Sequence, residues 1–121
     1  MFGVVFYKDR KGNEPVLEYM RSLNKRNDKD SRIKLNKIRD YVIVLKRHGT
    51  KAGEPYVKHI DGEIWELRPL RDRILFAAWS KGQFVLLHCF LKKSRKTPKR
   101  EIVHAKRNLQ DLMERSQGDE Y

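Results

Sequence analysis

The sequence contains a single cysteine, and this scarcity excludes several kinds of small protein. With only Cys89, no intramolecular disulfide can form, and the second cysteine of a zinc finger is missing. Long apolar runs are also lacking, since the longest, 74–79 and 84–91, suit buried strands and are too short to span a bilayer. The apolar start has no basic leader and meets charge at Lys8, unlike a secretory signal. We therefore expect a cytoplasmic protein without a membrane partner.

Acidic residues are few relative to basic ones. Lys and Arg number 28 and Asp and Glu 16, which gives a net charge of +12. A small domain with this excess is most simply compensated by a polyanion. Nucleic acid is the first candidate, ahead of an acidic protein or an anionic surface. The length of 121 residues predicts one domain over 1–121 with one modest core.

The first half of the chain predicts one strand followed by two helices. Residues 2–7 are rich in β-branched and aromatic side chains, which is typical of a strand. Asn13 is expected to cap a short helix that has Pro15 in its first turn. A longer helix is predicted over 30–47, with Gly49 just past its end as a left-handed cap. The segment 49–62 is expected to be the least structured.

The second half predicts three strands and a final helix. Strands are expected over 64–70, 73–80 and 83–92, and their short turns make them antiparallel neighbours. Thr97 as cap and Pro98 at the first position predict a last helix, followed by a frayed tail over 117–121. The predicted fold class is α+β, in the order β-α-α-β-β-β-α: an antiparallel sheet with an N-terminal helical hairpin and a C-terminal helix.

Basic side chains gather in two places along the second half. Arg68, Arg71 and Arg73 lie around the first strand turn. The segment 92–107 carries eight cations and a single acid, Glu101. Because the strand ends bring these segments toward one rim, we expect a concave basic site with His88 nearby. A phosphate-binding role for this segment is favoured over a merely solvated helix start.

Two motifs in this region resemble a known family. The first is the stretch from Ile64 to Arg73, Ile-Trp-Glu-Leu-Arg-Pro-Leu-Arg-Asp-Arg. The second is His88-x-Phe90-x-Lys92-Lys93, then four residues, then Pro98-x-x-Glu101-Ile102-x-x-Ala105. Together, in this order, they are similar to HigB-type toxins, the phage-derived branch of the RelE superfamily. The resemblance extends over essentially the whole chain and implies the RelE-like fold.

The resemblance implies ribosome-dependent cleavage of messenger RNA by attack of a 2′-hydroxyl on the adjacent phosphate. It places Arg73 as the arginine that grips the phosphate, Lys93 as an acid or clamp, and Arg68 as a cation facing the RNA. Such chemistry needs cations for charge that grows on the nonbridging oxygens. The expected catalytic residues are Arg68, Arg73, His88 and Lys93. The expected RNA-binding residues are Arg71, Lys92, Arg95, Lys96 and Lys99.

The general base stays open at this point. Many RelE relatives carry a tyrosine on the last helix, but here the turn 99–103 has no aromatic residue. His88 or a lysine would have to serve as base, although His88 is equally well explained as a core histidine. The nearby acids Glu63, Glu66 and Asp72 are scattered, so we expect no metal ion and no cofactor.

The resemblance also implies partners, and it leaves two other functions to consider. The implied partners are the ribosome, messenger RNA and a cognate antitoxin, a HigA-like helix-turn-helix protein encoded beside the toxin. One alternative is a non-catalytic RNA- or ribosome-binding module that uses the same basic surface. The other is an interaction domain whose basic face docks an acidic protein.

Overall fold

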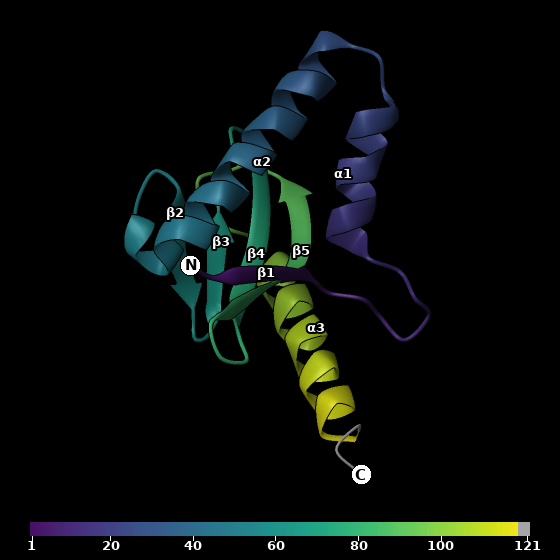
Figure 1. Cartoon of the computed structure of the whole chain (residues 1–121), viewed down its shortest axis with the longest axis vertical. Helices are drawn as coiled ribbons and strands as arrows, with labels where there is room; N and C mark the ends of the chain where they lie inside the picture. The colour runs from purple at the N-terminus through teal and green to yellow at the C-terminus, as the bar shows by residue number, and fades with distance from the viewer. Residues whose placement is uncertain (119–121) are drawn as a thin grey trace.

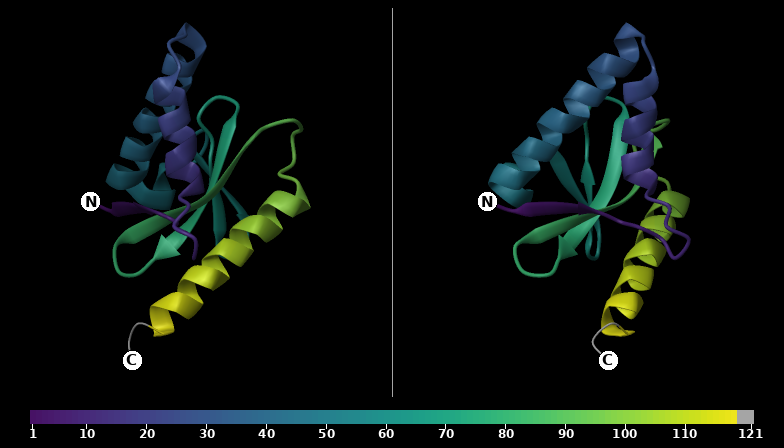
Figure 2. Two further views of the ribbon diagram at one scale, coloured as in Figure 1. Left: turned by 90° about the vertical axis from the view of Figure 1, so that its right-hand side faces the viewer. Right: turned by 45° about the vertical axis from the view of Figure 1, so that its right-hand side comes forward.

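Five strands form one sheet, and helices cover both of its faces (Figures 1 and 2). The computed structural model describes residues 1–118, and it confirms the α+β class and the order of the predicted elements. The elements are β1 (Gly3–Phe6), α1 (Pro15–Lys25), α2 (Lys29–His48), the 3-10 helix η1 (Gly49–Ala52), β2 (Val57–Asp61), β3 (Ile64–Leu67), β4 (Asp72–Trp79), β5 (Gln83–Leu91) and α3 (Lys99–Gly118).

The strand order in the sheet is β1-β5-β4-β3-β2. The predicted meander is confirmed, because β3, β4 and β5 pair antiparallel. Two features differ from the prediction. The segment expected to be least structured contains β2, an edge strand antiparallel to β3. In addition, β1 joins the other edge parallel to β5, with Gly3 opposite Gln83 and Phe6 opposite Leu86.

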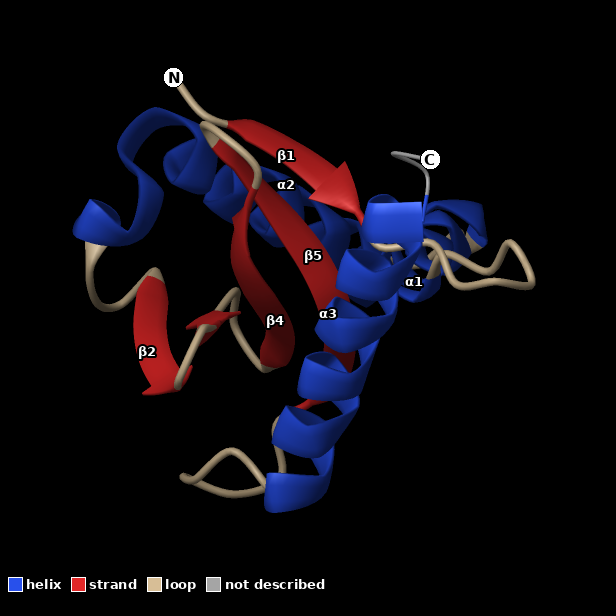
Figure 3. Ribbon diagram, turned by 90° about the horizontal axis from the view of Figure 1, so that it is seen from below, coloured by secondary structure: helices blue, strands red, loops and turns tan. Residues whose placement is uncertain are grey.

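The alternation of side chains along β4 divides the core into two layers. Ile74 and Phe76 point toward the hairpin of α1 and α2, where the larger apolar cluster lies. Leu75 and Ala77 point toward α3, which contributes Ala105 and Leu109 to the second cluster, among others. Figure 3 shows α3 lying across β5. Each face of the sheet is thus shielded by helices, and each has its own core.

The helix ends follow local signals in part. Asp28 caps α2 by accepting a hydrogen bond from the Ser31 amide, and Gly49 follows that helix with φ of 61° as predicted. Two predicted caps are wrong. Asn13 donates to Asp9 instead, and α1 has no side-chain cap. Thr97 donates its hydroxyl proton to Glu66, because a buried carboxylate lies within its reach.

The C-terminal helix is fastened to the start of the chain. The Tyr7 hydroxyl donates to Asp111 Oδ2 over 2.6 Å, and Arg10 Nε donates to Oδ1 over 2.8 Å. The hydrogen bond from Tyr7 lowers the pKa of Asp111 to about 2. Burial, followed by the contact with Asp111, raises the pKa of Tyr7 to about 12.

This helix continues through Gln117 and Gly118, so the predicted frayed tail begins later than expected, and its residues 119–121 lie outside the described residues. Over residues 1–118, no helix combines the length and the apolar character that crossing a membrane requires.

Candidate nucleic-acid interface

A buried carboxylate lies at the centre of the basic surface. Glu66 on β3 shares the α3 face of the sheet with its cross-strand neighbour Leu75, and its side chain is only 3% exposed. Oε1 lies 3.4 Å from Arg68 Nε and 3.7 Å from Arg73 Nε. Oε2 accepts a 2.6 Å hydrogen bond from the Thr97 hydroxyl. One carboxylate therefore holds two arginines and the end of the loop 92–98 that leads into α3.

Arg73 is an internal residue. Its side chain is 7% exposed, and Nη1 donates to the carbonyls of Leu70 at 2.8 Å and Asp72 at 2.9 Å. Burial lowers the pKa of Arg73, and the neighbouring Glu66 opposes this effect. Leu70 lies in the left-handed region with φ of 56°, which is rare for a residue with a side chain. Arg73 therefore fixes a strained turn between β3 and β4.

Arg68 lies closer to solvent than Arg73. Its side chain is 21% exposed, and Nη1 is 3.4 Å from Oε1 of the exposed Glu54. Its buried Nε is near Glu66 but makes no hydrogen bond with any described residue. The outer end of this guanidinium is held only by one weak, exposed ion pair. Arg68 is therefore better placed than Arg73 to exchange its protein partner for a phosphate.

Two hollows adjoin Glu66, and cations surround both. The larger, of about 230 Å³, is lined by Lys58, His59, Ile60, Glu66, Arg68, Arg95, Lys96, Thr97 and Ile102. The smaller, of about 10 Å³, is lined by Glu66, Arg73, Phe90, Lys92, Lys93, Ser94, Arg95, Lys96, Thr97 and Pro98. The smaller hollow has room for roughly one water molecule. Only the larger one is open to a group the size of a phosphate.

His88 lies beside a third hollow. This space of about 370 Å³ is lined by Phe90, Leu91, Lys93, Pro98, Arg100 and Glu101. The Nε2 atom of His88 is 3.0 Å from Glu101 Oε1, and its ring stacks on His104 with the centroids 4.1 Å apart. Burial, followed by the proximity of His88, lowers the pKa of His104. Lys93 lines both this hollow and the smallest one, so the three hollows follow one another along the loop 92–98.

The predicted site residues are thus partly brought together. Arg68, Arg95 and Lys96 line the larger hollow, while Arg73, Lys92 and Lys93 line the smaller one beside it. Arg71 and Lys99 are exposed and line none of the described hollows, and Arg71 Nη2 lies 3.4 Å from the Lys92 carbonyl. His88 lies at the far end of the row, joined to it through Glu101.

Three residues of this surface were missed or undervalued by sequence reasoning. Lys58 lies on β2, opposite Glu66, in a segment where no strand was expected. Thr97 was interpreted as a helix cap, and Glu66 as one partner of an arginine pair. A useful signal was available for Glu66: an acid between apolar residues of a strand is buried, and burial requires a partner of opposite charge.

A second buried carboxylate lies on the opposite face of β4. Asp72 Oδ1 accepts a 2.6 Å hydrogen bond from the Tyr19 hydroxyl and lies 3.8 Å from Lys34 Nζ. Burial and this hydrogen bond raise the pKa of Tyr19, and burial raises the pKa of nearby Cys89 to about 12. Asp72 therefore attaches the helical hairpin to the start of β4, at the position next to Arg73.

The chain was also compared with known proteins. The family model described as "Phage derived protein Gp49-like (DUF891)" matches residues 18–110. That span includes β2 to β5, the loop 92–98 and the first half of α3. No curated protein matches the chain. Over residues 1–118, no group of three or more His, Cys, Asp or Glu side chains is arranged to hold a metal ion. Because the family model matches well over half of the sequence, the chain belongs to the Gp49-like family of phage-derived proteins, a toxin-like family of the RelE/Gp49 type.

Proposed function

We propose that this protein is the toxin of a HigB-type toxin–antitoxin pair and cleaves messenger RNA on the ribosome in the cytoplasm. Its proposed partners are the ribosome with its message and a HigA-like helix-turn-helix antitoxin. Membership of a toxin-like family supports the proposal, and the net charge of +12 favours a polyanionic substrate.

The observation that carries the proposal is the larger hollow beside Glu66. Lys58, Arg68, Arg95 and Lys96 surround a volume of about 230 Å³, and Glu66 is the single acid in its lining. Arginine can bind two phosphate oxygens at once, and lysine adds a compact positive charge. Because Arg68 and Arg73 share Glu66, their positions are fixed before any RNA arrives, which is the preorganisation that transition-state stabilisation requires.

The proposed reaction uses no metal ion and is an internal displacement at phosphorus. The 2′-oxygen of the RNA loses its proton to a base and forms a bond to phosphorus. The bond from phosphorus to the 5′-oxygen breaks, and that oxygen takes a proton from an acid, leaving a 2′,3′-cyclic phosphate and a 5′-hydroxyl. Arg68 and Lys96 would stabilise the charge on the nonbridging oxygens. Lys93 is our candidate acid, and His88, oriented by Glu101, is our candidate base. Neither lines the larger hollow, so the loop 92–98 would move to bring both to the phosphate held by Arg68 and Lys96.

Arg73 has a different place in this proposal from the one that the resemblance implies. Its Nη1 atom is occupied by two carbonyls, and its own hollow holds roughly one water molecule. Arg73 would act by fixing the turn that carries Arg68, and would contact RNA only after movement of the loop 92–98.

The experiment that tests the proposal is a translation reaction with a defined message, in which the 5′ ends of fragments are mapped. The wild-type protein should produce cuts only when ribosomes are present. Arg68→Ala should reduce cleavage by about a hundredfold or more, because a transition-state donor is removed. Arg32→Ala, an exposed arginine on α2, is the matched control and should cleave normally. An intact message with the wild-type protein would contradict the proposal.

A second candidate is a non-catalytic RNA- or ribosome-binding module. The observation that favours it is the small size of the hollow that Glu66, Arg73 and Lys92 line, about 10 Å³, which has no room for a phosphate. A binder would retain salt-dependent affinity for ribosomes without cutting the message, and Arg68→Ala would weaken that affinity only modestly.

A further inference from the structure

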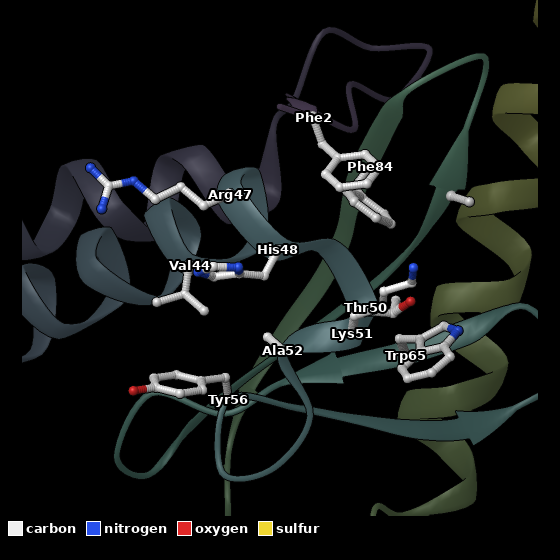
Figure 4. A pocket seen from close by; sticks show the side chains of 11 residues that line it. Phe2, Val44, Arg47, His48, Thr50, Lys51, Ala52, Tyr56, Trp65 and Phe84 are labelled. Carbon is white, nitrogen blue, oxygen red and sulfur yellow. The ribbon is translucent and has the colours of Figure 1, made fainter.

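A large hollow lies away from the basic site. It has a volume of about 850 Å³ and opens between the end of α2, η1 and the sheet (Figure 4). The lining residues are Phe2, Val44, Arg47, His48, Thr50, Lys51, Ala52, Tyr56, Trp65, Ala78 and Phe84. We call this space the aromatic groove. Its floor is mostly apolar, although the surface around it is highly charged.

One wall of the aromatic groove is built around Phe2. The Phe2 amide donates to the Lys46 carbonyl over 2.8 Å, and its ring lies 5.2 Å from that of Phe84. The other side of the ring rests on Gly49, where a Cβ atom would lie only 2.8 Å from Phe2 Cε2. Phe2 is nevertheless 38% exposed. An exposed aromatic side chain held by a backbone bond, a ring and a glycine forms a preorganised surface.

The charges of the aromatic groove have one sign. Arg47, His48 and Lys51 are exposed at its rim, and none of the described lining residues is acidic. An apolar floor with a basic rim is complementary to an acidic segment that carries large apolar side chains. The positive charge at the rim therefore indicates that the partner covering the groove is acidic.

The aromatic rings favour a protein over RNA as the occupant. Tyr56 packs edge to face with Tyr41 at 5.0 Å, and Trp65 packs likewise with His59 at 5.0 Å. Phe84 is turned edge-on to Phe76. Phe84 is buried and Tyr56 and Trp65 are only partly exposed, so little of these ring faces is open to the base stacking by which proteins hold single-stranded RNA. Apolar side chains of a helix, by contrast, fit between them.

We propose that the aromatic groove docks an acidic amphipathic helix of the antitoxin. The nature of the groove is argued from its own residues, whereas the name of the partner rests on the proposed function. The groove and the basic site lie on opposite faces of the sheet: Trp65 lines the groove on the side of the helical hairpin, whereas the next residue, Glu66, faces α3. A helix bound in the groove therefore leaves the hollows around Glu66 uncovered.

The test uses a synthetic acidic peptide of roughly 16 residues, with Leu and Trp on one helical face and Glu elsewhere. Amide chemical shifts of the labelled full-length protein map its binding site, and a fluorescence titration gives its affinity. Shifts should concentrate at the groove lining. Lys51→Glu and Ala78→Glu, both exposed positions, should each weaken binding by about tenfold or more. Lys37→Glu, at a partly exposed α2 residue outside the lining, is the control and should change the affinity less than about twofold.

Each other outcome overturns the proposal. Peptide shifts confined to the loop 92–98 would mean that only net charge attracts the peptide. Equal weakening by Lys37→Glu would mean the same. Groove shifts caused by a uridine oligonucleotide, without peptide binding, would identify a second RNA site instead.

The proposed function is tested separately by adding Ala78→Glu to the translation reaction. If the Ala78→Glu variant cleaves the message normally but no longer binds the peptide, both the proposed function and the proposed docking surface are supported. If the wild-type protein binds the peptide in the groove but does not cleave RNA, the docking surface is supported and the proposed toxin function is contradicted.

Discussion

The substitution Glu66→Gln removes the charge that joins Arg68 and Arg73 while keeping the shape of the side chain. The amide can still accept the hydrogen bond from Thr97, so the change isolates the electrostatic contribution. In the wild-type protein Oε1 lies 3.4 Å from one guanidinium nitrogen and 3.7 Å from the other. After the substitution, two guanidinium groups remain close together, and only the exposed Glu54 still pairs with one of them, Arg68.

The expected loss of stability follows from burial. Removing one partner of a buried ion pair typically costs about 3–5 kcal/mol. Arg73 is 7% exposed and should show most of this effect, whereas Arg68 is 21% exposed and solvent screens part of its charge. We therefore expect the free energy of unfolding to fall by about 2–4 kcal/mol, which corresponds to a decrease in Tm of about 10 °C for a chain of this size.

Urea unfolding of the purified variant, followed by circular dichroism, measures this loss directly. Glu63→Gln removes an exposed acid three residues away, and its unfolding free energy should stay within about 0.5 kcal/mol of the wild type. A loss below about 1 kcal/mol for Glu66→Gln would refute the reasoning, because the arginines would then be held by the carbonyls and the backbone alone. The same variant should bind RNA at least as tightly as the wild type, but cleave it more slowly.

Four further predictions concern other parts of the molecule. The pKa of Cys89, raised to about 12 from 9.0, should slow its alkylation at pH 8 about a thousandfold relative to the unfolded chain, as thiol labelling with and without urea would show. Asp111→Asn should lower Tm at neutral pH. Because the folded pKa of about 2 lies below the unfolded 3.8, the difference from the wild type should shrink as the pH falls below about 4. The Tyr7 contact, with its folded pKa raised from 10.0 to about 12, should weaken as the pH rises above 10, so Tyr7→Phe should differ least from the wild type there. Leu70→Gly should raise the unfolding free energy by about 0.5–1 kcal/mol, because glycine adopts a φ of 56° without strain, and an unchanged or lower value would contradict this.

Local signals were sufficient for most of the fold. The spacing of apolar residues predicts both hairpin helices and the three meander strands. β2 was not predicted because only two of its five residues, Val57 and Ile60, are shielded from solvent. In addition, a bulge between His59 and Asp61 breaks the alternation of apolar and polar side chains that identifies a strand. The parallel pairing of β1 was equally hidden, since strand propensity carries no information about direction and the connecting helices decide it.

The site was less predictable, for a physical reason. The basic residues could be counted, but which of them are buried depends on register between strands and on packing against α3. Arg73 and Arg68 look alike in the sequence, yet only Arg73 is enclosed by the turn carbonyls. His88 likewise turns toward Glu101, thirteen residues later, through a contact that only the docking of α3 creates.

The pairing of β1 with β5 also determines when a newly made molecule becomes complete. β1 is synthesised first, but its partner residues 83–86 and the loop 92–98 follow only after most of the chain has been made. Contacts between such distant segments delay folding until both have emerged. A nascent chain therefore carries Arg68 and Arg73 without the complete enclosure of Glu66 until Thr97 has been made.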